Sequence, residues 1–412
     1  MPEIRLDRTF WPVGHGAFYT EHFRDSLNNR IFTAVYDCGG KDENVVLQNI
    51  NNMLRVAGKK IDVLFISHLH RDHINGFDYL KSRTSIKHII LPYLTKSAIA
   101  EAYIYNAING IKNGHCDTES PLQQFVFNLG NNENTDDNIT FVQSGEETRF
   151  IEDIRELPDI DHLGKYIESG LPIKVLGDIH NGHEPYWIYI PINVKFDEEK
   201  CKKLIDKICK TMHFSHIKNG DDINWQELQD ALRSAGKKDI TAVKRAYKEI
   251  FEGNHNAYSM PVYSGPSCKL HPRFWDIWSY RDSYAQQWMK DRCPKSIHFN
   301  NGDNRFDFSE MLPCLYMGDF EAKDETKLLE LQRILGGYYD IVGMQQIPHH
   351  FSLNNHSIEL YKNRICAFGN VDNHGDISFT QSVCHEIGRY APTLVITEEK
   401  ETKFRCHFEF WY

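Results

Sequence analysis

The sequence predicts an α/β fold, and three observations support this prediction. Short apolar runs typical of buried strands recur in the first 93 residues, turn residues separate them, and a helical pattern follows one of them. The chain has 412 residues, of which 41% are hydrophobic and 12% aromatic, so it can bury a large core. This length allows two or three domains or one elaborated domain.

The strand-like runs in residues 1–93 are RIFTAVYD, IDVLFIS and KHIILP, and NGFDYLKSR is a short helix candidate. From about residue 94 to 170 the pattern is weaker. Within this stretch, NNENTDDN is expected to form an exposed loop, because its residues favour turns. Two strand-like runs follow, IKVLG and WIYIPINVKF.

Residues 197–253 change to a helical period, and we interpret them as an inserted helical module. WQELQDALRSAG is expected to end at Gly236 as a C-cap, and DITAVKRAYKEIFEG to begin at Asp239 as an N-cap. The first helix, DEEKCKKLIDKICKTM, places four apolar residues on one face: Cys201, Leu204, Ile205 and Ile208.

A second, aromatic-rich insertion is predicted at residues 266–310. Its segment FWDIWSYRDSYAQQW has near-helical spacing, which favours a packed core face, with stacking on unpaired bases as the alternative. From MLPCLYMGD onward, strands and one helix resume.

Composition excludes several classes of protein. The N-terminus lacks the basic start and apolar stretch of a secretory signal, and no run of about 18 apolar residues occurs, so we expect a soluble cytoplasmic protein without membrane contact. The 10 cysteines form no CxxC pair, which argues against a disulfide framework or a thiolate zinc site and predicts mostly buried thiols. The net charge of −10 argues against loose, charge-driven binding along nucleic acid.

The stretch SHLHRDHING follows a predicted strand and is rich in metal ligands. His68 and His70 alternate on a loop and can point two imidazoles at one ion, while Asp72 and His73 lie one turn further and can face a second ion. A solvated histidine-rich loop is the plainer interpretation. The pattern HxHxDH, placed after a strand and before a glycine, favours metal binding.

HxHxDH resembles the metallo-β-lactamase superfamily, whose fold packs two mixed β-sheets together with helices outside. Three further motifs occur in the order expected for that family: AVYDCGG with Asp37, CLYMGD with Asp319, and DIVGMQQIPHHFS with His349 and His350. The resemblance implies a catalytic domain formed by residues 1–93 and 254–412, with residues 94–253 as an insertion.

Within the superfamily, the chain is most similar to the ComEC-like hydrolases of DNA uptake. The shared segments are VGHG, NAYS, LYMGD, PHHFS and AFGNVDNHGD. By this resemblance Asn370 and His374 are candidate substrate contacts, with a simple turn as the alternative, and Asn256, which stands where other members have a third histidine, is a further candidate contact. Asn256, His255 or water would complete the ligands of the first ion at that place. Phe351 replaces a glycine of the branch, which predicts narrower access to that corner of the site.

The resemblance also implies a role for each residue. His68 and His70 hold one ion, Asp319 bridges to the second, and that second ion is held by Asp72, His73 and His350. Water between two ions would lose a proton near neutral pH and act as the nucleophile, with Asp72 orienting it. Asp37 would orient ligand histidines, or alternatively cap a turn, and His349 would either support the ligand residues or contact the substrate. Two divalent ions, Zn²⁺ or Mn²⁺, suit these ligands.

These inferences predict a metal-dependent phosphodiesterase or nuclease acting on DNA or RNA, and by analogy a bacterial defence effector. A phosphodiesterase of a small cyclic or linear nucleotide is one alternative, and a metal-free binding or scaffolding module is another. We expect both inserts near the mouth of the site, where they would select the substrate or a protein partner. His70 and Asp72 are expected on a rim loop, where truncation creates no cavity.

Overall fold

The structure is a computed structural model that describes most of the chain. The described residues are 3–111, 115–131, 138–145, 157–176, 187–195, 198–212, 223–251, 258–267, 274–279, 312–372, 377–391 and 393–411. The residues of the predicted loop NNENTDDN between 132 and 137 lie outside these ranges.

The first sheet has nine strands and is mixed. It is antiparallel from β11 to β3 and parallel from β3 to β7. In sheet order, its strands are β11 (Phe274–Ser279), β16 (Phe404–Trp411), β1 (Glu3–Phe10), β2 (Tyr19–Asp25), β3 (Arg30–Tyr36), β4 (Lys60–Phe65), β5 (Ser85–Pro92), β6 (Ile139–Gln143) and β7 (Tyr166–Glu168).

The second sheet has seven strands and is also mixed. It is parallel from β15 to β12 and antiparallel from β12 to β8. In sheet order, its strands are β15 (Thr393–Ile396), β14 (Cys366–Asn370), β13 (Met344–Gln346), β12 (Cys314–Tyr316), β10 (Val262–Pro266), β9 (Trp187–Pro191) and β8 (Ile173–Leu176).

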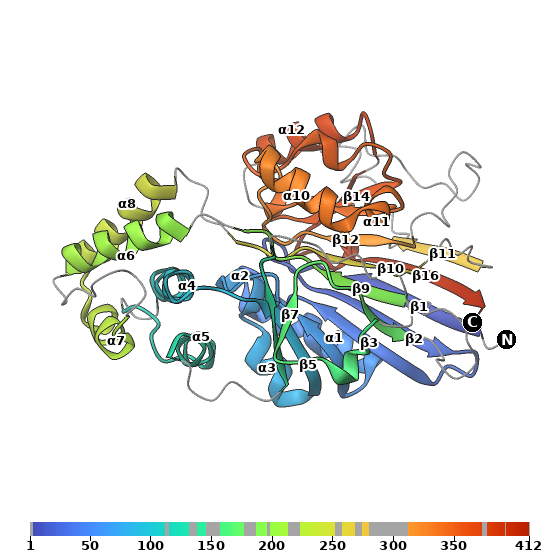
Figure 1. The fold of residues 1–412 in the computed structure, drawn as a ribbon, viewed down its shortest axis with the longest axis horizontal. Coiled ribbons are helices and arrows are strands. Elements are labelled where there is room, and N and C mark those ends of the chain that lie inside the picture. Colours follow the sequence, from blue (N-terminus) through green and yellow to red (C-terminus); the bar gives the residue numbers. More distant parts are fainter. Residues whose placement is uncertain are drawn as a thin grey trace.

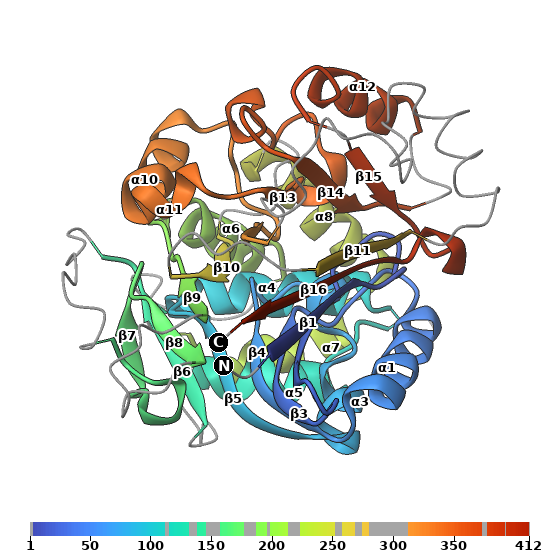
Figure 2. The ribbon, with the colours of Figure 1, turned by 90° about the vertical axis from the view of Figure 1, so that its right-hand side faces the viewer.

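Helices cover the outer faces of both sheets and extend to one side (Figures 1 and 2). The α-helices are α1 (Glu43–Ala57), α2 (Arg71–Ile74), α3 (Phe77–Arg83), α4 (Lys96–Asn109), α5 (Pro121–Asn131), α6 (Glu198–Met212), α7 (Trp225–Ser234), α8 (Lys237–Phe251), α10 (Glu325–Leu335), α11 (Gly337–Asp340) and α12 (Ile377–Ile387). Short 3₁₀ turns are η2 (Ile160–His162), η5 (His349–Phe351), η6 (Ile358–Leu360) and η7 (Lys400–Thr402).

Side-chain alternation along the strands produces the layers. On β4, Val63 and Phe65 enter the core between the sheets, whereas Leu64 joins the core beneath α1. A third core lies between the second sheet and α10 and α12. Figure 1 shows α1 and α3 on one side of the paired sheets and α10, α11 and α12 on the other. The predicted α/β fold, with two mixed sheets and outer helices, is confirmed.

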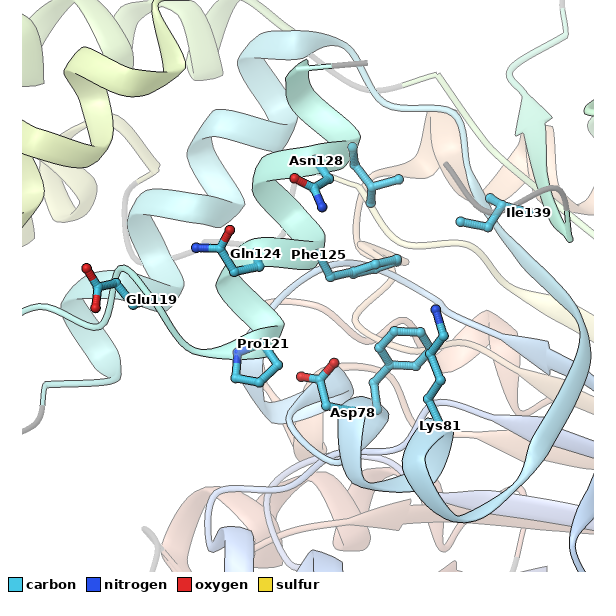
Figure 3. Close-up of a pocket in the computed structure, with 10 residues that line it drawn as sticks. Asp78, Lys81, Glu119, Pro121, Gln124, Phe125, Asn128 and Ile139 are labelled. Atoms are coloured by element: carbon cyan, nitrogen blue, oxygen red, sulfur yellow. The ribbon is translucent and has the colours of Figure 1, made fainter. Parts of the chain in front are cut away.

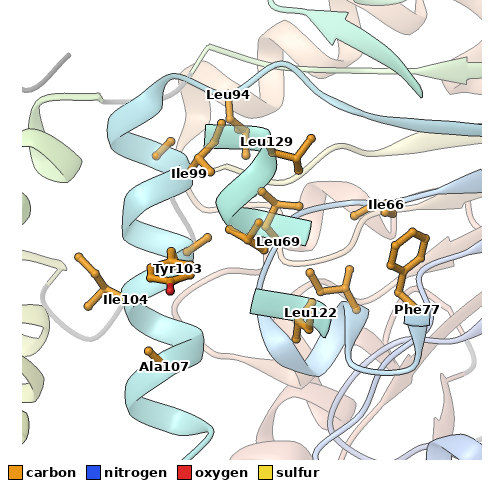
Figure 4. Close-up of a cluster of buried hydrophobic side chains, with 14 of the residues drawn as sticks. Ile66, Leu69, Phe77, Leu94, Ile99, Tyr103, Ile104, Ala107, Leu122 and Leu129 are labelled. Carbon is orange, nitrogen blue, oxygen red and sulfur yellow. The ribbon is translucent and has the colours of Figure 1, made fainter. Parts of the chain in front are cut away.

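Helices α4 and α5 occupy the region where the sequence pattern was weak. Almost every side of α4 is buried, so its apolar residues show no helical period, which explains why the sequence did not reveal it. Ile99 and Tyr103 of α4 pack with Leu122 and Leu129 of α5 (Figure 4). Figure 1 shows α4 and α5 between the sheets and the group formed by α6, α7 and α8.

The helical module forms as predicted, with two corrections at its boundaries. The four apolar residues predicted to share one face of α6 are all buried. Helix α7 ends at Ser234 with Ala235 as its C-cap, so the expected cap at Gly236 is wrong. Helix α8 begins two residues before Asp239, whose carboxylate accepts a hydrogen bond from Gly236 N at 2.9 Å. Asp239 thus satisfies an N-terminal donor from inside the first turn.

The predicted inserts contribute strands to both sheets. Within residues 94–253, β6 and β7 extend the first sheet, and β8 and β9 extend the second. In the aromatic insert, residues 274–279 form β11, which pairs with β16 at the sheet edge, so the expected helical face is wrong there. The near-helical aromatic spacing was misleading because β16 supplied backbone hydrogen-bond partners that favour a strand. The domain boundaries stay a prediction.

Two composition-based expectations concern cysteines and membranes. The eight described cysteines are all free and buried, as expected of small apolar residues. None of the helices in the described ranges is long and apolar enough to span a membrane.

Candidate metal centre

The predicted site residues follow the carboxyl ends of strands in both sheets. Asp37 follows β3 and His68 follows β4, two parallel neighbours in the first sheet. Asp319 follows β12 and His350 follows β13, two parallel neighbours in the second. Because parallel strands end at the same edge, loops from the two sheets converge on one place.

Asp37 anchors the HxHxDH loop. Its Oδ1 accepts a hydrogen bond from Ser67 N, and its Oδ2 one from Ser67 Oγ, both at 2.7 Å. Oδ2 also lies 2.7 Å from Nδ1 of His73, and both side chains are fully buried. With Nδ1 held by a carboxylate, the other ring nitrogen of His73 faces the centre of the site. The arrangement favours the orienting role predicted for Asp37 over a simple turn cap.

Four of the predicted residues form one compact group of ligand atoms. Asp72, His73, Asp319 and His350 each offer an atom within 4.8 Å of the others. Nε2 of His73 lies 3.1 Å from Asp319 Oδ1 and 3.2 Å from Nε2 of His350. Nε2 of His350 lies 3.4 Å from Asp72 Oδ2 and 3.4 Å from Asp319 Oδ1. Nitrogen and oxygen donors gathered in this way fit a divalent ion.

The second oxygen of Asp319 faces different residues. Oδ2 lies 3.7 Å from Nε2 of His68 and 3.8 Å from Nε2 of His349. Nε2 of His68 is buried and makes no hydrogen bond within the described part of the chain. A buried nitrogen in this state is costly unless something else binds it, and a cation would satisfy it. The donors beside Oδ2 therefore fit a second ion.

His70 has a different position from the one expected. It is 1% exposed rather than at a rim, because α4 covers it. Its Nε2 lies 3.3 Å from Glu101 Oε2, and its ring stacks on Tyr105 with centroids 4.1 Å apart. The expectation of a rim position is therefore wrong for His70, whereas the Asp72 side chain is 17% exposed.

Two unusual turns present the ligands from the second sheet. The φ angles of His349, His350 and Phe351 are 50°, 50° and 65°, three consecutive residues in the left-handed region, where backbone strain is typical of functional sites. Gly318 has a φ of 54°, and a Cβ there would lie 2.4 Å from Ser259 Oγ. Glycine at this position lets Asp319 N donate to Ser259 Oγ at 3.0 Å.

Burial and neighbouring charges shift the pKa values of the central side chains in opposite directions. Burial alone would lower the pKa of His73, but the carboxylates of Asp319 and Asp37 outweigh it and raise that pKa well above its usual range. Despite burial, the adjacent imidazoles, His73 foremost, hold the pKa of Asp319 well below its usual range. Burial and His73 hold the pKa of His68 well below its usual range, which keeps this imidazole in the neutral form that binds metals.

The predicted substrate contacts are only partly described. Asn256 and His374 lie outside the described residues. Asn370 is 1% exposed, and its amide accepts from Tyr19 Oη at 2.9 Å and donates to Trp11 O at 3.0 Å. Its backbone oxygen lies 3.3 Å from Nδ1 of His350. This position favours support of His350 over contact with a substrate.

Phe351 also differs from its expected role. It is 1% exposed and belongs to the core beneath α10 and α12. A side chain buried in this core does not narrow access to the site, so that expectation is wrong.

Sequence reasoning missed two residues that contact predicted site residues. His15 lies within the VGHG segment, which could have pointed to it; its Nε2 is 3.4 Å from Asp72 Oδ2, and its ring lies 3.9 Å from that of His350. Glu101 could have been found as the lone acidic residue in the apolar segment KSAIAEAYIYNAIN.

One pocket of about 420 Å³ lies apart from these residues, between α3 and α5 (Figure 3). Phe77 and Phe125 form part of its apolar lining, and Asp78 and Lys81 are charged members. It contains none of the predicted ligands. We therefore place the candidate site at the strand ends and not in this pocket.

Comparisons with known proteins give a family match over part of the chain. Residues 32–191 match the Metallo-beta-lactamase superfamily. No curated protein matches the chain. A solved structure described as the crystal structure of unliganded yeast PDE1 is similar, with a TM-score of 0.36 and 9% sequence identity, covering 99% of this chain and 100% of that chain. The superfamily match, with the ligand group, supports a metal-dependent hydrolase.

Proposed function

We propose that the chain, which carries a metallo-β-lactamase superfamily domain, is a phosphodiesterase that cleaves DNA or RNA with two divalent metal ions. One observation carries the proposal: the two oxygens of Asp319 face two different sets of imidazoles. His73 and His350 lie on the Oδ1 side, and His68 lies on the Oδ2 side. A carboxylate arranged in this way can serve two ions at once.

The donor set favours phosphodiester chemistry. When bound, two ions would supply a nucleophile near neutral pH and stabilise both the attacking and the leaving oxygen of an in-line displacement. The residues described at the centre include no thiolate ligand, which suits Zn²⁺ or Mn²⁺ bound through nitrogen and oxygen.

Each of the residues at the centre would have a separate role in catalysis. Asp72, partly exposed, would orient the attacking water, and Asp37 would hold His73 in the required tautomer. His349, with a side chain 18% exposed, would contact the substrate from the side of Asp319 Oδ2. We propose His68 and His70 as ligands of one ion, and Asp72, His73 and His350 as ligands of the other.

A small cyclic or linear nucleotide is the second candidate substrate. The net charge of −10 favours it, because an acidic protein gains little from long phosphate backbones. A ComEC-like branch and a role in defence stay predictions.

Hydrolysis assays test the proposal. The full chain, loaded with Zn²⁺ or Mn²⁺, is incubated with single-stranded and double-stranded oligonucleotides, a cyclic dinucleotide and bis(p-nitrophenyl) phosphate. We expect cleavage that chelation abolishes and added metal restores. Cleavage of the cyclic dinucleotide alone would favour the second candidate. Failure to cleave any of these phosphodiesters with either ion would overturn the proposed chemistry.

A further inference from the structure

Helix α4 carries a buried carboxylate directly beside the metal-binding loop. Glu101 is 0% exposed, and its Oε2 lies 3.3 Å from Nε2 of His70. Two more residues of the same helix contact the loop. Tyr105 stacks on the His70 ring with an interplanar angle of 19°, and Asn106 Nδ2 donates to Leu69 O at 2.8 Å. One face of α4 therefore fixes both the backbone and the imidazole of this part of the loop.

Glu101 is itself held by other elements. The hydroxyl of Tyr258 donates to Glu101 Oε2, and Tyr247 on α8 donates to the backbone oxygen of Glu101 at 2.7 Å. Helix α4 also packs against α6, and its apolar residues belong to one continuous core with α5, α6, α7 and α8. Helix α4 thus connects the helical module, through Tyr247 on α8, to the metal-binding loop, through the Glu101 carboxylate.

A buried carboxylate needs an explanation beyond packing. Burial of a charge costs free energy, and an apolar residue of similar volume would stabilise a core at least as well. Oε2 of Glu101 contacts the polar atoms of His70 and Tyr258, and the first of these residues is a proposed metal ligand. The placement of the Glu101 carboxylate therefore indicates that it acts on His70.

We propose that Glu101 is a positioning residue that fixes the tautomer and ring orientation of His70, so that helix α4 completes one of the two metal sites. This inference rests on the two-metal site of the proposed function. When Nε2–H of the imidazole donates to Glu101, Nδ1 keeps the lone pair and becomes the nitrogen available to a cation. Only the ion held by His68 and His70 depends on this contact.

Zinc affinity tests the inference directly. The full chain, stripped of metal, is titrated with Zn²⁺ against a chromogenic chelator, which gives the number of ions and the affinity of each. We expect Glu101→Ala to weaken one ion by about 10- to 100-fold and to leave the other unchanged. Glu101→Gln keeps an oxygen that can accept from Nε2–H, so it should recover part of this loss.

Two further variants separate positioning from stability. Ile99→Ala truncates a buried residue of α4 that packs toward α5, so it should lower the melting temperature without changing either zinc affinity. Tyr258→Phe removes the hydroxyl that holds Oε2 and should weaken the same ion as Glu101→Ala, by a smaller factor; it is also the test if Glu101→Ala does not fold.

The possible failures are distinct. A wild-type chain that binds no Zn²⁺ or Mn²⁺ would overturn the proposed function and this inference with it. A wild-type chain with two ions and unchanged affinities in Glu101→Ala would overturn the inference alone.

Discussion

Oδ1 of Asp319 lies 3.1 Å from Nε2 of His73, although Asp319 follows β12 of the second sheet and His73 lies in α2, which follows β4 of the first sheet. His73 is in turn fixed by Asp37 at the end of β3. The contact therefore joins the carboxyl edges of both sheets. Because Asp319 also faces His68 with its other oxygen, it is the residue whose loss should affect the centre most.

Metal content should reveal this shared role. We expect the purified chain to hold close to two divalent ions, and Asp319→Asn to lose more metal than any single histidine variant, since only a bridging carboxylate serves both ions. Elemental analysis after dialysis against Zn²⁺ or Mn²⁺ measures this. A wild-type chain without metal would contradict the expectation.

Asp37→Asn should weaken one ion by about 10- to 100-fold, because the charged partner of His73 is lost while its shape is kept. Asparagine tolerates the left-handed φ of 54° at this position, so the backbone should be undisturbed. Zinc titration against a chelator measures the affinity. The ion weakened by this variant should be the one that Glu101→Ala leaves unchanged.

Asp72→Asn should abolish phosphodiester cleavage while the free energy of unfolding changes by about 1 kcal/mol or less, because its side chain is partly exposed. His70→Ala should abolish cleavage and also cost roughly 1–3 kcal/mol, because it leaves the buried Glu101 without this partner. Activity assays and urea unfolding compare the two. Equal losses of unfolding free energy in the two variants would contradict the difference expected from the burial of His70.

His350→Ala and His349→Ala should separate metal binding from substrate contact. Nε2 of His350 belongs to the compact ligand group, so its loss should release metal. His349 lies 3.8 Å from Asp319 Oδ2 and outside that group, so its loss should leave metal content unchanged and lower turnover by about 10²-fold. Metal analysis and single-substrate kinetics on both variants measure the two effects.

The stability of the fold should depend on pH through Asp7 and His407 of the first sheet. These residues pair across β1 and β16, with Asp7 Oδ1 2.9 Å from His407 Nδ1. The hydrogen bond to Asp7 raises the pKa of His407 above 6.5, so its contribution is complete below pH 6.5 and is lost as pH rises through the raised value.

The pKa of Asp7 shifts the other way. Burial would raise it, but the contacts with His407 and Arg405 lower it below 3.8, so its contribution is lost only as pH falls through that lowered value. Urea unfolding of wild type and His407→Gln should therefore differ more at about pH 5.5 than at about pH 9. A difference that does not decrease toward the alkaline end would contradict this linkage.

The sequence by itself determined the fold class and the metal-binding loop. Short apolar strand-like runs, such as IDVLFIS, depend only on local pattern, and HxHxDH concentrates its donors within six residues. The amphipathic helices of residues 198–251 could also be predicted from local pattern, since each has one apolar face.

Only the tertiary structure decided which distant residues meet. Helix α4 is buried on nearly all sides, so it has no periodic pattern, and nothing local shows that Glu101 reaches His70. Strand β11 also depends on a distant partner. Its aromatic spacing favours a helix, but pairing with β16 makes it a strand. Burial of His70 and of Asn370 likewise depends on neighbours from other elements, because exposure is a property of packing and not of the residue alone.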